Sequence, residues 1–212
     1  DVYSGNLSQL GGSEAEESTL QFAKFSKDAS RVAYVRRDNI YVQELETGNI
    51  EQLTTDVSDT LINGLFDWVY EEEFHAKDGF RWSPDGEKIA YWQLDTSAAQ
   101  DFLMINNTDG LYPQVTRFPY PKVGEENSAA RVGVVSLASK KTVWAKLPGV
   151  ARDMYIPRMD WANNSSTHIL VQHLNRKQDT NHVYAVAAQS GALTTILVDR
   201  EQEFIEIYDD VT

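Results

Sequence analysis

The chain has 212 residues, of which 42% are hydrophobic, so it is long enough to bury a substantial core as one larger or two smaller domains. Its net charge of −13 argues against binding to nucleic acid or to anionic membrane surfaces and favours a cationic or amine-bearing ligand. The absence of cysteine excludes disulfides, thiolate metal sites and a cysteine nucleophile. No apolar run reaches the roughly 18 to 20 residues of a membrane-spanning helix.

One unit, made of an aromatic residue, a polar turn and an alternating strand, occurs three times along the chain. Its copies are Phe25–Val35, Trp82–Trp92 and, in a degenerate form, Trp161–Val171. Further strands separated by a glycine turn follow the first copy, at 39–45 and 50–54, and the third copy, at 182–187 and 193–197. Four strands in roughly 40 to 50 residues is the size of one β-propeller blade. The predicted fold class is therefore all-β, a partial β-propeller of about three to four blades of four-stranded antiparallel sheet.

The number of blades suggests that the ring is incomplete. Three blades and a partial one at Val2–Leu10 are fewer than the roughly four to eight of a closed propeller. The strand-like segments 1–7 and 206–212 at the two ends also indicate a part of a larger protein. Unpaired sheet edges invite pairing with missing blades or with a second copy. A β-sandwich with irregular loops is the alternative fold, but the threefold repeat favours the propeller.

Insertions separate the three copies of the repeat. The second insertion, 95–122, is too rich in proline for a helix. The first contains the acidic segment Asp67–Phe74, in which three consecutive glutamates lie between aromatic residues. Asp67 can cap a short helix by accepting backbone N–H bonds. Helical spacing would place four apolar side chains on one face of this helix: Phe66, Val69, Tyr70 and Phe74.

This acidic segment has the composition of an amine-binding site. Adjacent carboxylates raise one another's pKa, and a cation between them relieves the repulsion. A protonated amine suits this position because it carries several N–H donors in a small volume. At helical spacing, Glu72 and Glu73 can both lean over one cavity edge. The alternative is that the acidic run is an ordinary solvated face.

The stretch Asn63–Ser97, which contains the acidic segment and Gly79–Gly86, resembles the N-terminal propeller of the dipeptidyl peptidase IV family of prolyl oligopeptidase-type serine peptidases. The proline-rich segment Tyr112–Gly124 is similar to the same family, and Asp78–Arg81 looks bacterial. The resemblance implies that residues 1–212 are an incomplete part of an eight-bladed N-terminal propeller domain, without the α/β-hydrolase domain that follows it. It further implies that the whole enzyme removes dipeptides from the free N-termini of peptides, with a preference for Pro or Ala as the second residue.

In this family the second and third glutamates of the run bind the substrate's α-ammonium, which implies that role for Glu72 and Glu73. Trp68, Tyr70 and Glu71 would support them. An α-amino group has a pKa near 8 and is largely protonated at neutral pH. An amine held there would set the scissile bond about 7 Å away, the span of two extended residues. Because the chain has no Gly-x-Ser-x-Gly motif, we expect no catalytic residue and no activity in it alone.

The expected partners are a peptide with a free N-terminus, the C-terminal hydrolase domain and, through open edges, a second copy. A tripeptidyl peptidase and a non-catalytic propeller for protein interaction remain alternatives. No cofactor and no metal site are expected, because the histidines lack metal-ligand spacing and are predicted to be structural: His75, His168, His173 and His182. The resemblance to bacterial members implies a periplasmic or other extracytoplasmic location.

Overall fold

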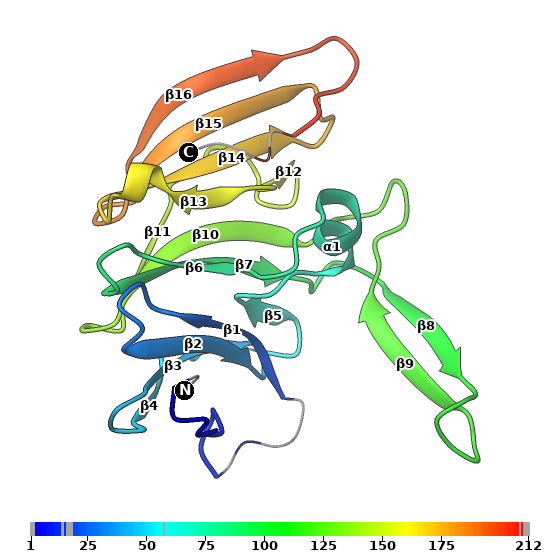
Figure 1. Ribbon diagram of the computed structural model, residues 1–212. Helices are drawn as coiled ribbons and strands as arrows, with labels where there is room; N and C mark the ends of the chain where they lie inside the picture. Colours follow the sequence, from blue (N-terminus) through cyan, green and yellow to red (C-terminus); the bar gives the residue numbers. More distant parts are fainter. Residues whose placement is uncertain (1–2, 14, 16–18, 57, 208, 210–212) are drawn as a thin grey trace.

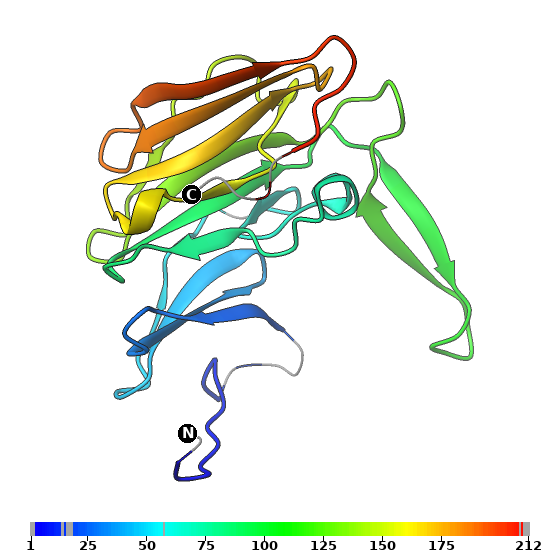
Figure 2. The same cartoon turned by 45° about the horizontal axis from the view of Figure 1, so that its top comes forward.

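The computed structural model of the chain describes residues 3–13, 15, 19–56, 58–207 and 209. Three antiparallel sheets lie side by side in chain order, and a two-stranded hairpin projects away from the second sheet (Figures 1 and 2). The arrangement confirms the predicted all-β partial propeller. We call the sheets blades 1, 2 and 3.

Each blade is an antiparallel sheet whose strands come from one region of the chain. Blade 1 has the order β1-β2-β3-β4, from β1 (Leu20–Phe25), β2 (Arg31–Arg36), β3 (Asn39–Glu44) and β4 (Ile50–Gln52). Blade 2 has the order β11-β10-β7-β5 with β6 also paired to β7, from β5 (Leu61–Asn63), β6 (Phe80–Trp82), β7 (Lys88–Asp95), β10 (Ala129–Ser136) and β11 (Thr142–Trp144). Blade 3 has the order β12-β14-β15-β16 with β13 paired to β14, from β12 (Met154–Tyr155), β13 (Met159–Trp161), β14 (His168–Asn175), β15 (Thr180–Ala187) and β16 (Leu193–Arg200).

Blade 2 carries both insertions. A short helix, α1 (Trp68–Phe74), lies between β5 and β6. The hairpin of β8 (Asp101–Asn106) and β9 (Gln114–Pro119) lies between β7 and β10. The proline-rich segment is thus extended rather than helical, as its composition indicated. A single 3-10 turn, η1 (Ala162–Asn164), occupies the turn of the degenerate third repeat.

The repeated aromatic residue joins neighbouring blades. In blades 2 and 3 its indole N–H donates to a main-chain oxygen of the preceding blade: Trp82 to Lys24 at 3.0 Å and Trp161 to Arg81 at 3.2 Å. Phe25 holds the same place in blade 1, where no earlier blade lies among the described residues, and it is 65% exposed. The repeat therefore encodes a contact between blades as well as a turn within one.

Two hydrophobic cores fill the space between the blades. The core between blades 1 and 2 contains Val35, Ile40, Phe80, Ile89 and Tyr91 among others. The core between blades 2 and 3 also includes the inner face of α1, and its members include Phe66, Tyr70, Trp92, Ile156 and Val171. Removal of this apolar surface from water is the main force that holds the blades together. Helix α1 is thus part of the core and not an appended loop.

The expected strands at the two ends are not found. Residues 3–10 contain a turn but no strand, and Tyr3 and Leu7 are each 98% exposed. Residues 201–207 and 209 form no strand either, while Val2, Tyr208 and 210–212 lie outside the described residues. The predicted partial blade at Val2–Leu10 is therefore wrong for its described part. A strand is stable only when it bonds to a neighbouring strand, and within the described residues segment 3–10 belongs to none of the sheets.

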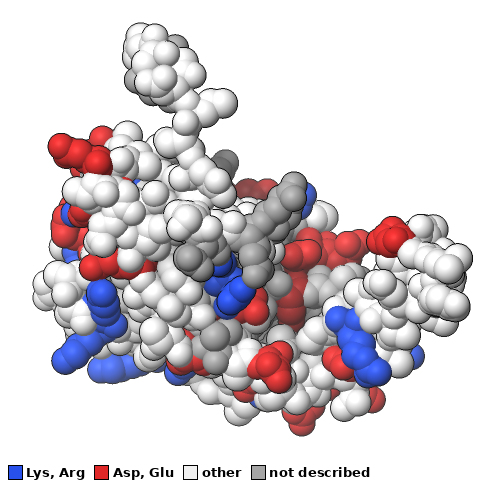
Figure 3. Space-filling view, turned by 90° about the horizontal axis from the view of Figure 1, so that it is seen from below, with Lys and Arg blue, Asp and Glu red and all other residues white. Residues whose placement is uncertain are grey.

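The negative charge is spread over the molecule. Figure 3 shows acidic side chains in several separate places on one face, with Lys and Arg between them. Within the described ranges, no helix is long and apolar enough to cross a membrane. The charged surface therefore gives no single site by itself, and a candidate site has to be identified from its shape and contacts.

Candidate functional site

Helix α1 begins as the sequence indicated. The Asp67 carboxylate accepts a hydrogen bond from the Tyr70 backbone N–H at 3.1 Å. Its other oxygen accepts the Ser128 hydroxyl from the start of β10, at 2.6 Å. Burial raises the pKa of Asp67, although both hydrogen bonds act in the opposite direction. The first turn of the helix is therefore fixed to blade 2.

The apolar face of α1 is buried between blades 2 and 3. Phe66 packs against Trp92 with ring centroids 5.1 Å apart, and Phe74 packs against Tyr155 at 5.3 Å. The backbone N–H of Ile156 donates to the Tyr70 hydroxyl at 2.9 Å, and burial strongly raises the Tyr70 pKa. Tyr70 therefore lies beneath the helix and supports it.

The three glutamates of α1 are all exposed to solvent. Glu72 and Glu73 form no ion pair and no side-chain hydrogen bond with any residue that the structure describes. Burial and the nearby Asp67 raise the pKa of Glu71, while Lys77 acts in the opposite direction. Among the described residues the carboxylates of Glu72 and Glu73 have no partner, which leaves them available to a cation from outside.

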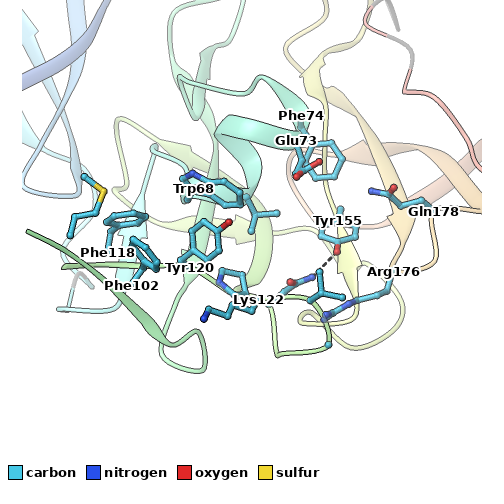
Figure 4. A pocket seen from close by; sticks show the side chains of 16 residues that line it. Trp68, Glu73, Phe74, Phe102, Phe118, Tyr120, Lys122, Tyr155, Arg176 and Gln178 are labelled. Carbon is cyan, nitrogen blue, oxygen red and sulfur yellow. Dashed lines mark hydrogen bonds between the residues drawn. The ribbon is translucent and has the colours of Figure 1, made fainter. Parts of the chain in front are cut away.

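A large open pocket of about 1210 Å³ lies beside the helix (Figure 4). Glu73 lines it, together with Trp68 and Val69, whereas Glu72 does not. The first wall is aromatic because Trp68 packs against Tyr120 at the base of the hairpin, with centroids 4.1 Å apart. The pocket brings together the exposed edge of α1, the hairpin β8–β9 and blade 3.

The second wall of the pocket is polar and comes from blade 3 and the loop before β10 (Figure 4). The Asn127 amide donates to the Tyr155 hydroxyl at 2.8 Å. Arg176, in the β14–β15 turn, donates to the Glu125 main-chain oxygen at 2.6 Å. No sequence motif marks Asn127 and Arg176, since each lies alone in a loop or turn and is brought to the pocket by the packing of the blades.

None of the four histidines is among the residues that line this pocket. His75 and His168 are exposed, and His75 ends α1 in the left-handed conformation with φ of 53°. His173 and His182 face each other across β14 and β15 with ring centroids 6.1 Å apart. Burial and the neighbouring His182 lower the pKa of His173. The described residues contain no group of three side chains that could hold a metal ion.

Comparison with known proteins gives consistent results. Residues 1–212 match the family described as "Dipeptidyl peptidase IV (DPP IV) N-terminal region". The chain is similar to the crystal structure of dipeptidyl peptidase 4 from Porphyromonas gingivalis, with a TM-score of 0.81 and 33% identity over 87% of this chain and 26% of that one. It is 29% identical to "Inactive dipeptidyl peptidase 10" of Mus musculus, over 91% of this chain and 24% of the relative. It is 28% identical to dipeptidyl aminopeptidase B of Saccharomyces cerevisiae, over 88% of this chain and 23% of the relative. The chain thus spans about a quarter of the length of these relatives.

Proposed function

The chain belongs to the family of dipeptidyl peptidase IV N-terminal regions, and from this premise we propose that it is part of the substrate-selecting propeller of a serine exopeptidase. Its substrate is a peptide with a free N-terminus, from which the whole enzyme releases a dipeptide with Pro or Ala second. The hydrolase domain supplies the catalytic residues, and the propeller binds the α-ammonium group. An extracytoplasmic location in a bacterium accords with this activity and with the similarity to the P. gingivalis enzyme.

One observation carries this proposal. Glu73 is exposed at the edge of the large pocket and has no partner among the described residues, while the helix that bears it is fixed from below. Glu72, which precedes it on the helix, is also exposed but does not line the pocket, and in this proposal it supplies the second carboxylate. Because the helix backbone is already held in place, less order has to be gained when its carboxylates bind an ammonium group, which improves both affinity and orientation.

The amine site also determines where the substrate is cut. A bound ammonium group fixes the first residue of the peptide, and two extended residues span about 7 Å. A nucleophile at that distance cuts only after the second residue. Binding of the N-terminus thus makes the enzyme an exopeptidase, because an internal peptide segment has no ammonium group to bind.

The test replaces each carboxylate in the full-length enzyme by the isosteric amide. Glu72→Gln and Glu73→Gln should each lower kcat/KM for an Xaa-Pro substrate about 10- to 150-fold, the effect of about 1.5 to 3 kcal/mol for a hydrogen bond to a charged group. Glu46→Gln, on the exposed β3–β4 turn, is the matched control and should behave as wild type. Wild-type turnover by both Glu72 and Glu73 variants would refute the proposal.

A second candidate is a propeller that binds peptides or proteins without cleaving them. It is favoured by the similarity to a relative that is named inactive. In this case the full-length protein should bind a free-amine tripeptide such as Ala-Pro-Ala in calorimetry but release no dipeptide from it. The amino-acid sequence that follows Thr212 would decide between the two candidates, because only a peptidase needs the Ser, Asp and His of a hydrolase domain.

A tripeptidyl peptidase would use the same amine site with its nucleophile one residue farther away. Mass spectrometry of products from matched Xaa-Pro and Xaa-Xaa-Pro peptides separates the two specificities. Pairing of two copies through open edges stays a prediction, and sedimentation of the full-length protein tests it.

A further inference from the structure

The end of α1 next to Glu73 is bound by a cation from blade 3. Arg158, the residue before β13, donates from Nη1 to the main-chain oxygen of Phe74 at 2.9 Å. Phe74 directly follows Glu73 and is the last residue of the helix. The same guanidinium also donates to its own neighbour, the Pro157 oxygen, at 2.8 Å.

A carboxylate holds this guanidinium in place. Asp209 accepts hydrogen bonds from Arg158 Nε at 3.0 Å and from Nη2 at 2.5 Å through a single oxygen. The Arg158 side chain is 28% exposed, whereas that of Asp209 is 79% exposed. The arginine is therefore packed against the protein, while its carboxylate partner lies at the surface. The ion pair between them is partly exposed and contributes only weakly to holding the arginine.

The helix end needs such a donor. The last carbonyl groups of a helix have no partner within the helix, and a cation there is favoured by the helix dipole. The turn after Phe74 is also unusual, because His75 adopts a positive φ of 53°. Residues other than glycine rarely adopt this backbone conformation. The bond from Arg158 fixes the carbonyl at this turn and so limits rotation of the last turn of α1.

Arg158 acts on the backbone and leaves the carboxylate side chains free. Within the described residues it forms no ion pair with Glu72 or Glu73, although it is bonded to the residue next to Glu73. It therefore fixes the acidic edge of α1 without neutralising it. The neighbouring Ile156–Tyr70 bond holds the middle of the helix from the same segment of blade 3.

We propose that Arg158 is a positioning residue that sets the location of Glu73 for amine binding, with Asp209 holding the arginine in turn. The inference rests on the proposed function, since it assigns Arg158 to the ammonium site of that function. The ammonium site then depends on two blades, because blade 2 carries the carboxylates and blade 3 fixes the helix that bears them.

The test measures how much more tightly the protein binds a peptide with a free amine than the same peptide without one, and it does not measure overall activity. Calorimetry on the full-length protein gives the Kd of Ala-Pro and of N-acetyl-Ala-Pro. The Kd of the acetylated peptide divided by that of the free peptide reports the ammonium contribution alone. Arg158→Ala should lower this ratio about 10-fold, since displacement of a positioned group by a fraction of an ångström has effects of that size. Arg158→Lys keeps one donor and should recover part of the ratio. Asp209→Asn should lower it about 2- to 5-fold, as expected for a partly exposed pair.

Controls separate a positioning role from a general loss of structure. Lys141→Ala removes an exposed cation from the β10–β11 turn and should leave the ratio unchanged. The Kd of the acetylated peptide should stay constant in every folded variant. If Arg158→Ala fails to fold, Arg158→Lys and Asp209→Asn decide the question. A wild-type ratio in Arg158→Ala, or in both remaining variants, overturns the inference.

The same ratio distinguishes failure of this inference from failure of the proposed function. Glu73→Gln should bring the ratio close to one if Glu73 binds the ammonium group. A collapsed ratio in Glu73→Gln with a wild-type ratio in the Arg158 variants refutes only the positioning role. An unchanged ratio in Glu73→Gln refutes the ammonium site and the positioning role together.

Discussion

The two insertions of blade 2 differ sharply in how they are held. Helix α1 has seven residues, yet it is fixed at its start by Ser128, in its middle by Ile156 and at its end by Arg158. The hairpin β8–β9 is longer, but it projects from the body and packs against it chiefly where Tyr120 meets Trp68 (Figure 1).

Their exposed side chains show the same difference. Tyr70 of α1 is 2% exposed, while three successive apolar residues of β8 are about half exposed: Leu103 52%, Met104 49% and Ile105 66%. A two-stranded hairpin without a covering surface is only marginally stable in water. A binding site requires groups held by packing and hydrogen bonds on a rigid element. Of the two insertions, α1 meets this requirement, which is why we assign the ammonium site to it.

The largest expected effect comes from removing the same side chain in the two insertions. Phe66→Ala leaves a cavity beneath α1, where Phe66 is 7% exposed, and should lower the free energy of unfolding by about 3 to 5 kcal/mol. Phe102→Ala in the hairpin, where Phe102 is 41% exposed, should cost less than about 1.5 kcal/mol. Urea denaturation of both variants measures the difference. Equal losses would show that the hairpin is as much a part of the core as the helix is.

A smaller effect tests the hydrogen bond in the middle of α1. Tyr70→Phe keeps the ring but leaves the buried Ile156 N–H without its acceptor, which should cost about 1 to 3 kcal/mol. Tyr112→Phe, at the hairpin turn where Tyr112 is 78% exposed, is the matched control and should change stability by less than about 0.5 kcal/mol. An unfolding free energy in Tyr70→Phe equal to that of wild type would mean that α1 does not depend on blade 3.

These contacts show which features the sequence could predict. The repeat Phe25–Val35 and its copies predicted the strand-turn-strand units, because turn residues and alternation are local signals. Asp67 as the helix cap and the apolar stripe of α1 were likewise predictable and are confirmed. The strand-like composition of segment 3–10 led to the wrong prediction of a partial blade, because a strand forms only where a neighbouring strand can pair with it.

The pocket itself was beyond sequence reasoning. Its polar wall places Arg176 and Asn127 in the same pocket as Glu73, and these residues are far apart in the chain. Tyr70 was expected to support Glu72 and Glu73, and its burial between two blades places it under the helix that carries them. Local patterns predict which face of a helix is apolar, but only the packing of blades decides which side chains meet around it.

The smallest expected effect concerns the junction between the two insertions. Trp68→Ala removes the ring that packs against Tyr120, a contact worth about 0.5 to 1.5 kcal/mol. Because the hairpin opens locally, hydrogen exchange of its amides at 101–119 should become roughly 2- to 12-fold faster, while amides of β7 and β10 should exchange as in wild type. Val115→Thr, half exposed on the hairpin away from this contact, is the control and should leave exchange near the junction unchanged. Equal acceleration in the hairpin and in blade 2 would show that the two open as one unit, and the contrast between a fixed helix and a separately moving hairpin would then be wrong.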